Sequence, residues 1–264
     1  MAEFTAKDVQ TLRQATGAGM MDAKRALQEN DGDFEAAARW LREKGLAGAA
    51  KRSDRENVQG AVSVANTGTA AAIVELKCET DFVAKAPDFT ALVEELADAV
   101  ATEGEDAAVT RGAAIDDLKV ALKENIELGR VVRFEAAPEA VLDTYLHLQN
   151  ERGVNGVMVE LVGGDRALAH DIALHVASSR PEYLTRDQVP ADRVEAERAV
   201  LENRTRNEGK PEQAIPKIVE GRLNGFFKEI CLLEQPFVKD QKQSVRQFLG
   251  DAAVTRFAQV EIAT

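Results

Sequence analysis

Residues 61–76 read AVSVANTGTAAAIVEL, two short apolar runs on either side of Asn66-Thr67-Gly68. A glycine-containing turn between two such runs is typical of a β-hairpin. A second pair of apolar runs, residues 145–148 and 157–161, flanks another glycine-containing segment downstream. We therefore expect two hairpins, one in each half of the chain.

Each expected hairpin is followed by an amphipathic helix and then by one more strand. These helices and strands are expected at residues 89–100, 130–135, 165–178 and 255–262. The dipeptide Glu-Leu occurs in both hairpins, at Glu75 and again 85 residues later at Glu160. This repeated order predicts an α+β fold with two related core subdomains, residues 61–140 and 141–264.

The first 45 residues predict a separate unit of three short helices. Thr5 and Asp8 fit a variant of the capping box, and Gly17-Ala18-Gly19 interrupts the first helix. Asp33 is expected to cap the third helix and Gly45 to end it. So small an apolar surface favours a recognition module, joined to the core by a linker at residues 46–60.

Two methionines follow the glycine-containing break in this module. Met20, Ala23 and Leu27 fall on one apolar stripe of the second helix. Met21 lies about 100° further around the helix, so both methionines cannot face a small core. We expect one of them to be exposed, where methionine suits an adaptable contact surface.

An insertion of about residues 190–232 interrupts the second subdomain. Residues 190–209 are charged and helical, and an apolar stripe at helical spacing runs from Ile215 to Ile230. Pro216 is expected to kink or restart the second helix. Together they predict an antiparallel helical coiled-coil hairpin that projects from the core and is also a candidate surface for self-association.

The charge balance argues against some classes of partner. The chain has 45 acidic and 33 basic residues, a net charge of −12, which disfavours general nucleic-acid binding and anionic membranes. Residues 39–55 are locally basic and residues 75–117 strongly acidic. Both stretches are first interpreted as solvated surface. The acidic stretch could also help to orient a partner protein.

Sequence signals of compartment favour the cytoplasm. We find no apolar run long enough to span a bilayer, and the N-terminal residues lack the apolar core of a signal peptide. The two cysteines, Cys78 and Cys231, are too few for a disulfide framework or a cysteine zinc site. We expect a soluble protein of a reducing compartment.

No catalytic motif is found. The chain contains no phosphate loop, dinucleotide fingerprint, zinc-protease motif, Cys-x-x-Cys pair or nucleophile elbow. His170 and His175 are five residues apart and would point in different directions from one helix. Cys78, near the end of an apolar strand, is interpreted as a buried thiol. We therefore expect no enzyme activity, no cofactor and no metal.

Residues 79–85, Glu-Thr-Asp-Phe-Val-Ala-Lys, are harder to explain as surface or core alone. They place a carboxylate beside a large aromatic residue where a strand ends and a helix begins. In one interpretation Asp81 caps the next turn and Phe82 folds into the core. In the other, the pair belongs to an exposed functional loop.

Several of these segments closely resemble signatures of the bacterial translation elongation factor Ts family. They occur in the order of that family and cover almost the whole chain. The matching segments are Leu12-Arg13, residues 16–22, Lys24, Ala26-Leu27, residues 30–33, Thr80-Asp81-Phe82-Val83-Ala84-Lys85, 175–177, 181–182, 209–211, 219–222 and 235–238.

The resemblance implies a guanine-nucleotide exchange factor that acts on elongation factor Tu, with no direct contact to nucleic acid or membrane. It implies a ubiquitin-associated-like N-terminal module, two related subdomains and an inserted coiled coil. By the same resemblance Phe82 is a wedge, and Asp81 disturbs the magnesium environment of the GTPase. Thr80 and Val83 would then hold the loop.

Four further residues match family positions that contact the GTPase: Arg13, Met20, Met21 and His147. Some family members continue past the last strand into a C-terminal helical module. Because this sequence ends at Thr264, we expect that contact to be missing while exchange is retained.

Two other functions stay open from the residues alone. A non-catalytic adaptor would use the N-terminal module to dock on another protein without changing nucleotide release. An enzyme would use Cys78 with one of the three histidines, and would be sensitive to thiol alkylation. The exchange rate, affinity and oligomeric state cannot be derived from the sequence.

Overall fold

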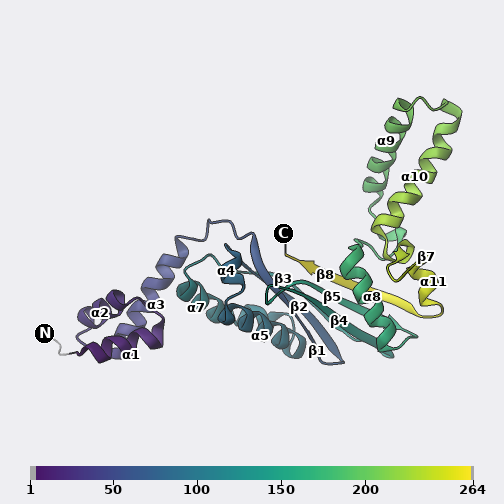
Figure 1. The fold of residues 1–264 in the computed structure, drawn as a ribbon. Helices are drawn as coiled ribbons and strands as arrows, with labels where there is room; N and C mark the ends of the chain where they lie inside the picture. The colour runs from purple at the N-terminus through teal and green to yellow at the C-terminus, as the bar shows by residue number, and fades with distance from the viewer. Residues whose placement is uncertain (1–3, 263–264) are drawn as a thin grey trace.

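The computed structural model describes residues 4–262, which form three parts in a row (Figure 1). A bundle of three helices is followed by a central core of strands and helices, and a pair of helices projects from the far side of that core. The α+β class predicted from the sequence is confirmed. Among the described residues, no helix combines the length and apolarity needed to cross a membrane.

The N-terminal bundle contains α1 (Ala6–Thr16), α2 (Met20–Glu29) and α3 (Phe34–Ala50). Thr5 and Asp8 form the predicted capping box. The amide of Asp8 donates to Thr5 Oγ1 at 3.3 Å, and the amide of Thr5 donates to Asp8 Oδ2 at 2.7 Å. Gly17 ends α1 with a φ of 65°, which glycine adopts without strain. Asp33 Oδ1 caps α3 by accepting from the amide of Ala36 at 2.8 Å.

The third helix does not end at Gly45, as expected, but continues to Ala50 and packs against α7 (Gly112–Leu122). A Cβ atom at Gly45 would lie 2.5 Å from Val120 Cγ1, so the two helices approach too closely here for any other residue. Packing against α7 therefore outweighs the helix-breaking tendency of glycine.

Two arginines add polar contacts between the bundle and the core. Arg42 Nε lies 3.1 Å from Asp117 Oδ1, and Arg52 Nη2 donates to the carbonyl of Lys119 at 3.1 Å. The linker expected at residues 46–60 thus begins as helix and is held against α7. Only residues 51–58 lie between α3 and the first strand.

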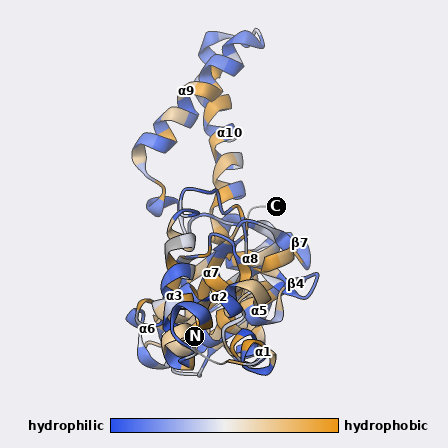
Figure 2. Ribbon diagram, turned by 90° about the vertical axis from the view of Figure 1, so that its left-hand side faces the viewer, coloured by the Kyte–Doolittle hydropathy of each residue, from blue (hydrophilic) through white to orange (hydrophobic). Residues whose placement is uncertain are grey.

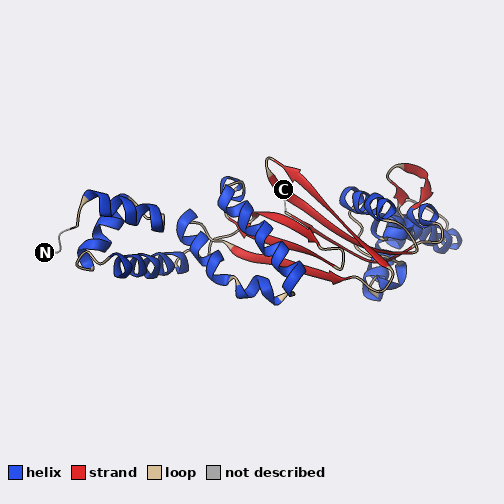
Figure 3. Cartoon of the chain, turned by 90° about the horizontal axis from the view of Figure 1, so that it is seen from below, coloured by secondary structure: helices blue, strands red, loops and turns tan. Residues whose placement is uncertain are grey.

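The first sheet has the order β1-β2-β3, with both pairs antiparallel. Its strands are β1 (Gln59–Asn66), β2 (Ala70–Cys78) and β3 (Glu127–Glu135). The predicted hairpin at Asn66-Thr67-Gly68 joins β1 to β2. Between β2 and β3 the chain forms α4 (Asp81–Ala84), α5 (Pro87–Glu103), α6 (Asp106–Thr110) and α7. The long helix α5 lies across one face of this sheet, as the view from below shows (Figure 3).

The second sheet has the order β4-β5-β8 and is covered by α8. Its elements are β4 (Ala140–Gln149), β5 (Arg152–Val162), α8 (Arg166–Ser179) and β8 (Ala253–Glu261). The turn of its hairpin is not the glycine-containing one that we expected. Asn150 and Glu151 form it, with φ of 51° and 65°. Gly153 lies within β5 instead, where a Cβ would overlap the carbonyl oxygen of Val62 in the other sheet.

The two sheets pack face to face, and each has its own helix on the outer face. Alternate residues of β2 divide between these layers, with Val74 packed toward α5 and Ile73 toward the other sheet. In β5, Val157 and Val159 pack toward α8, and Met158 packs between the sheets. Both middle strands are therefore buried on both faces, which explains their almost continuous apolar sequence.

Glu75 and Glu160 occupy corresponding places in the two sheets. Each is a buried carboxylate on a middle strand, at a bulge opposite the third strand. Glu75 Oε2 accepts from the amide of Arg130 at 2.9 Å. Glu160 accepts from Thr255 Oγ1 at 2.5 Å and from Arg256 Nη2 at 2.7 Å. The Glu-Leu repeat thus marks equivalent irregularities of the two sheets.

A pair of helices, α9 (Ala191–Asn207) and α10 (Ile215–Ile230), projects from the second half of the core. Pro216 lies in the first turn of α10, so it starts this helix rather than kinking it. The apolar stripe of α10 is buried against α9, and the far end of the pair is mostly hydrophilic (Figure 2). The remaining short elements are η1 (Arg186–Gln188), η2 (Glu212–Ala214), η3 (Leu232–Glu234), β6 (Pro236–Phe237), β7 (Asp240–Ser244) and α11 (Val245–Leu249).

A buried histidine fixes the base of this helical pair. The amide of Val238 donates to His175 Nδ1 at 3.1 Å, which places the proton of the neutral ring on Nε2. His175 Nε2 then donates to Gln235 Oε1 at 2.9 Å, and Gln235 Nε2 donates to the carbonyls of Ser179 and Glu229 at 3.2 and 2.7 Å. Burial lowers the pKa of His175 below its usual 6.5.

The close approach at Gly45 predicts opposite effects for two alanine substitutions on α3. Gly45→Ala inserts a methyl group against Val120, and we expect it to weaken docking of the bundle by about 1–3 kcal/mol. Gly48→Ala is the matched control, because its Cβ would meet only Arg52 Nη1 at 3.6 Å and alanine favours helix. Limited trypsin digestion at residues 51–55 should be faster in Gly45→Ala and not in Gly48→Ala. Equal rates would contradict this account.

The burial of His175 predicts a loss of stability in mild acid. Its pKa is lower in the folded state than in the unfolded one, so the unfolded chain takes up the proton first as the pH falls below 6.5. The free energy of unfolding should then decrease by up to about 1.4 kcal/mol per pH unit. Urea unfolding should show this slope in the natural sequence and a smaller one in His175→Gln. The same slope in both proteins would exclude His175 as its origin.

Candidate partner-binding site

The loop after β2 presents an exposed aromatic side chain on a single turn of helix. Thr80 caps α4, and its Oγ1 accepts from the amide of Val83 at 3.3 Å. Ala84 is buried and Val83 packs against the core, whereas Phe82 points outward and is 81% exposed. The cap is therefore Thr80 rather than Asp81, and Phe82 does not fold into the core.

This loop is held from the turn that follows α7. Glu124 Oε2 accepts from the amides of Glu79 and Thr80 at 3.0 and 3.1 Å, and Glu124 Oε1 accepts from Thr80 Oγ1 at 2.5 Å. In return, Glu79 Oε1 accepts from the amide of Asn125 at 2.6 Å. Sequence analysis missed Glu79, Glu124 and Asn125, because the two segments are about 45 residues apart and no local pattern connects them.

Asp81 is paired with a lysine of the same loop. Lys85 Nζ lies 2.5 Å from Asp81 Oδ2 and 5.8 Å from the centre of the Phe82 ring. The hydrogen bond from Lys85 holds the pKa of Asp81 below its usual 3.8. The carboxylate is thus ionised at neutral pH, and a partner would have to draw it away from Lys85 in order to use it.

Both methionines of the N-terminal module are exposed, Met20 by 49% and Met21 by 73%. At least one exposed methionine was expected, and here neither reaches the core, because Ala23, Ala26 and Leu27 fill the space against α1 and α3. Arg13, near the end of α1, is exposed as well. These three exposed side chains lie on the two helices that flank the break between α1 and α2.

His147 lies near the tip of the β4–β5 hairpin and is exposed. Its Nδ1 is 3.2 Å from the hydroxyl of Tyr145, and the neighbouring Leu148 is 63% exposed. Arg152, which begins β5, donates to the carbonyl of Gly60 in β1 at 2.7 Å. Gly60 pairs with Lys77 near the end of β2, so this hairpin tip and the Phe82 loop lie at the same end of the core.

The other reactive side chains are not assembled for catalysis. Cys78 is buried, donates to the carbonyl of Thr80 at 3.2 Å, and has its pKa raised to about 12, chiefly by burial. A thiol in this state is a poor nucleophile. His170, on α8, is paired with Asp143, on β4, and its Nδ1 lies 2.8 Å from Asp143 Oδ2. Among residues 4–262, no group of three or more metal-binding side chains is placed to hold a metal.

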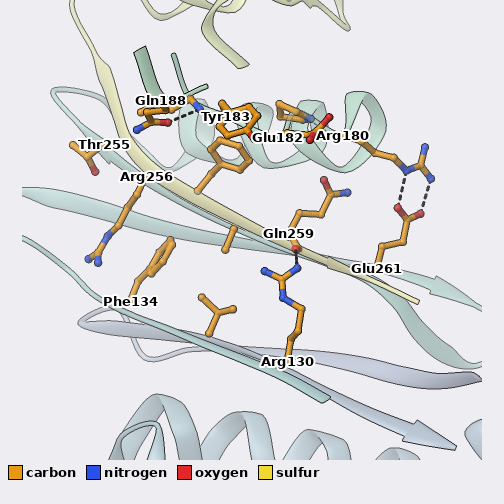
Figure 4. A pocket seen from close by; sticks show the side chains of 15 residues that line it. Arg130, Phe134, Arg180, Glu182, Tyr183, Gln188, Thr255, Arg256, Gln259 and Glu261 are labelled. Carbon is orange, nitrogen blue, oxygen red and sulfur yellow. Dashed lines mark hydrogen bonds and ion pairs between the residues drawn. The ribbon is translucent and has the colours of Figure 1, made fainter. Parts of the chain in front are cut away.

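A cavity of about 690 Å³ lies between β3, β8 and the segment that follows α8 (Figure 4). Its charged side chains are largely satisfied from within. Arg180 Nη2 is 2.5 Å from Glu261 Oε1, and Arg130 Nη1 donates to the carbonyl of Gln259 at 3.1 Å. None of the site residues predicted from the sequence lines this cavity.

Comparisons with known proteins give a consistent result. The family model for Elongation factor TS matches residues 79–264. The chain is 47% identical to Elongation factor Ts of Clavibacter michiganensis and 48% identical to that of Acidothermus cellulolyticus. It is 45% identical to Elongation factor Ts of Mycobacterium tuberculosis. Each alignment covers 99% of this chain and 99% of the relative.

The ion pair at the loop predicts a measurable change in one carboxyl group. Lys85→Met removes the hydrogen bond that stabilises the ionised form of Asp81, so the pKa of Asp81 should rise toward 3.8 or above. Carboxyl carbon NMR titration would measure this pKa. Lys123→Met, which also removes one exposed lysine, is the control and should leave it unchanged. An unchanged pKa in Lys85→Met would mean that the pair does not form in solution.

Proposed function

This chain belongs to the elongation factor Ts family, a family of translation elongation factors, and from that premise we propose that it is a guanine-nucleotide exchange factor. It binds the GDP form of elongation factor Tu, disturbs the magnesium and phosphate site, and promotes release of GDP so that GTP can bind. The protein changes no covalent bond in this process, so it acts as a binding protein in the cytoplasm rather than as an enzyme.

The observation that carries the proposal is the exposure of Phe82 on a loop with a firm base. A large apolar side chain that is 81% exposed leaves about 25 cal/mol of transfer free energy unrealised for each Å² of its surface. Burying the ring in a partner recovers this free energy. Because the loop is short and anchored at Thr80 and Ala84, insertion can displace the partner's own side chains instead of bending the loop.

Exchange by such a wedge needs no acid, base or nucleophile from this chain. A nucleotide that is held through magnesium and phosphate contacts is weakened by any partner that distorts those contacts. By linkage, nucleotide weakens binding of this protein by the same factor. Each ligand thereby lowers the affinity for the other, and the relative supply of GDP and GTP sets the final distribution.

We assign the following roles to the residues of the site. Phe82 is the wedge, Asp81 perturbs the magnesium environment once it leaves Lys85, and Thr80 and Val83 hold the loop. The flexible side chains of Met20 and Met21, with Arg13, contact the GTPase from the N-terminal module. His147 contacts it from the second hairpin.

The parts of the chain divide this work. Residues 1–45, extended by the rest of α3, are a docking module similar to a ubiquitin-associated domain, and residues 46–60 connect it to the core. Residues 61–140 and 141–264 are duplicated subdomains, which the matching Glu75 and Glu160 bulges support. The insertion at about 190–232 is a short coiled coil. Self-association through this coiled coil would have to use mainly polar contacts, since Val200 is its one exposed large apolar side chain.

The proposal predicts a specific effect of removing the wedge. Catalytic amounts of this protein should accelerate release of a fluorescent GDP analogue from elongation factor Tu, measured by stopped flow. Phe82→Ala should reduce that acceleration by about 10- to 100-fold, as expected for a central anchor residue. Because Phe82 is exposed, the free energy of unfolding of the Phe82→Ala protein should differ from that of the natural sequence by less than about 0.5 kcal/mol.

The matched control is Val109→Ala, which shortens another exposed apolar side chain on α6, away from the loop. It should leave exchange unchanged. Normal acceleration by Phe82→Ala would contradict the wedge assignment. A stable complex without faster GDP release would instead identify the protein as an adaptor.

A further inference from the structure

The loop that carries Phe82 and the turn after α7 hold each other through two reciprocal carboxylates. Glu124, from the turn, accepts from the amides of Glu79 and Thr80 and from the Thr80 hydroxyl, at 2.5–3.1 Å. Glu79, from the loop, accepts from the amide of Asn125 at 2.6 Å. We call this pair of interactions the carboxylate clasp.

We propose that Glu124 is a positioning residue for nucleotide exchange, because its carboxylate fixes the base of the loop from which Phe82 projects. This inference rests on the exchange function proposed above and adds to it a residue that does not itself touch the partner. It also assigns a role to a side chain 42 positions away from the wedge in the sequence.

The carboxylate of Glu124 satisfies all three of its donors in the clasp. Three donors converge on its two oxygens, and an ionised carboxyl group offers acceptor sites only. A glutamine side chain has the same length but one of its two terminal groups is a donor. Glu124→Gln can turn its oxygen to the two amides and its NH₂ group to Thr80 Oγ1, which also accepts from the amide of Val83, whereas Glu124→Ala removes the acceptor of all three bonds.

Besides the packing of Val83 and Ala84 and the cap from Thr80, the clasp is what holds the loop where it leaves β2. α4 is a single turn of four residues, and the outward face of that turn consists of Phe82 with the Asp81–Lys85 pair. The two amides bound by Glu124 lie immediately before this turn, between it and the end of β2. Losing their acceptor would free the backbone where the direction of α4 is set, so Phe82 would sample more orientations before it meets a partner.

The same turn also holds the connection to the N-terminal module. Asn125 is buried, and its Nδ2 donates to the carbonyls of Ser53 and Arg55 at 3.2 and 2.9 Å. Arg55 Nη1 is 3.4 Å from Glu79 Oε2, which links this segment to the clasp. The preceding helix, α7, bears the contact with α3. One turn of the chain thus sets the position of the wedge relative to the module that carries Met20 and Met21.

Two measurements test the role of Glu124 in the full-length protein. The first is hydrogen exchange of the Glu79 and Thr80 amides, which the clasp should protect. We expect exchange at these two amides to be at least about ten-fold faster in Glu124→Ala than in the natural sequence, and less affected in Glu124→Gln, which keeps an oxygen for them. Asn125→Ala is the matched control, because it removes buried bonds from the same turn but leaves both amides bound to Glu124.

The second measurement is the stopped-flow release of a fluorescent GDP analogue from elongation factor Tu at varied protein concentration. In Glu124→Ala we expect kcat to fall about ten-fold, as misplacement of an acting group does, with KM changed by less than about two-fold. The contact surfaces of Met21 and His147 remain in place, which is why KM should be preserved. Glu94→Ala, which removes an exposed carboxylate of α5 with no hydrogen bond or ion pair to any residue of 4–262, should leave both constants unchanged.

The outcomes separate this inference from the function on which it rests. If the natural sequence does not accelerate GDP release, the exchange function is wrong, and the role of Glu124 falls with it. If it does, and Glu124→Ala promotes nucleotide release normally, Glu124 is not a positioning residue even where amide exchange is faster. Unchanged protection of the Glu79 and Thr80 amides in Glu124→Ala would show that the clasp does not hold the loop, whatever the kinetics.

Discussion

The fold depends on the close face-to-face packing of the two three-stranded sheets. Gly153 permits this packing, because a side chain there would overlap the backbone of β1, and Ile73 and Met158 fill the layer between the sheets. Each sheet then needs only one helix to cover its outer face. β3 completes the first sheet and β8 completes the second. Because the two sheets are packed together, the loops that leave their strands at one end hold fixed positions relative to one another.

That shared end of the core is where the candidate site lies. The Phe82 loop leaves the first sheet there, and Arg152 ties the hairpin of the second sheet to β1 beside it. The proposed wedge can displace side chains of a partner only if its base resists displacement. That base includes β2, which is buried on both faces, the cap of Thr80 and the bonds from Glu124. This rigidity at the base, together with an exposed tip, distinguishes the loop from an ordinary surface connection.

Local patterns predicted the elements well, whereas contacts between distant segments could not be predicted. The first hairpin, the Thr5 and Asp33 caps and the helix start at Pro216 are each encoded within a few residues and are confirmed, and the second hairpin forms with a different turn. The errors arose where tertiary packing overrides local tendency, as at Gly45, where proximity to α7 keeps the helix intact. Within the site, the motif drew attention to Thr80 and Phe82, but Glu124 supports them from a different part of the chain and has no signal of its own.

The uneven charge of the sequence also has a partly internal explanation. Three of the basic side chains between residues 39 and 55 contact the acidic part of the core or its backbone: Arg42 pairs with Asp117, Arg55 with Glu79, and Arg52 binds the carbonyl of Lys119. Exposed pairs of this kind contribute little energy individually, but opposite charge on two facing surfaces selects one docking arrangement over others. Charge that looked in the sequence like solvated surface therefore helps to seat the N-terminal module on α7. In the loop, the charge of Asp81 is likewise paired within the chain, with Lys85. The acidic groups left without such partners, rather than the whole segment from residue 75 to 117, are those that could orient a binding protein.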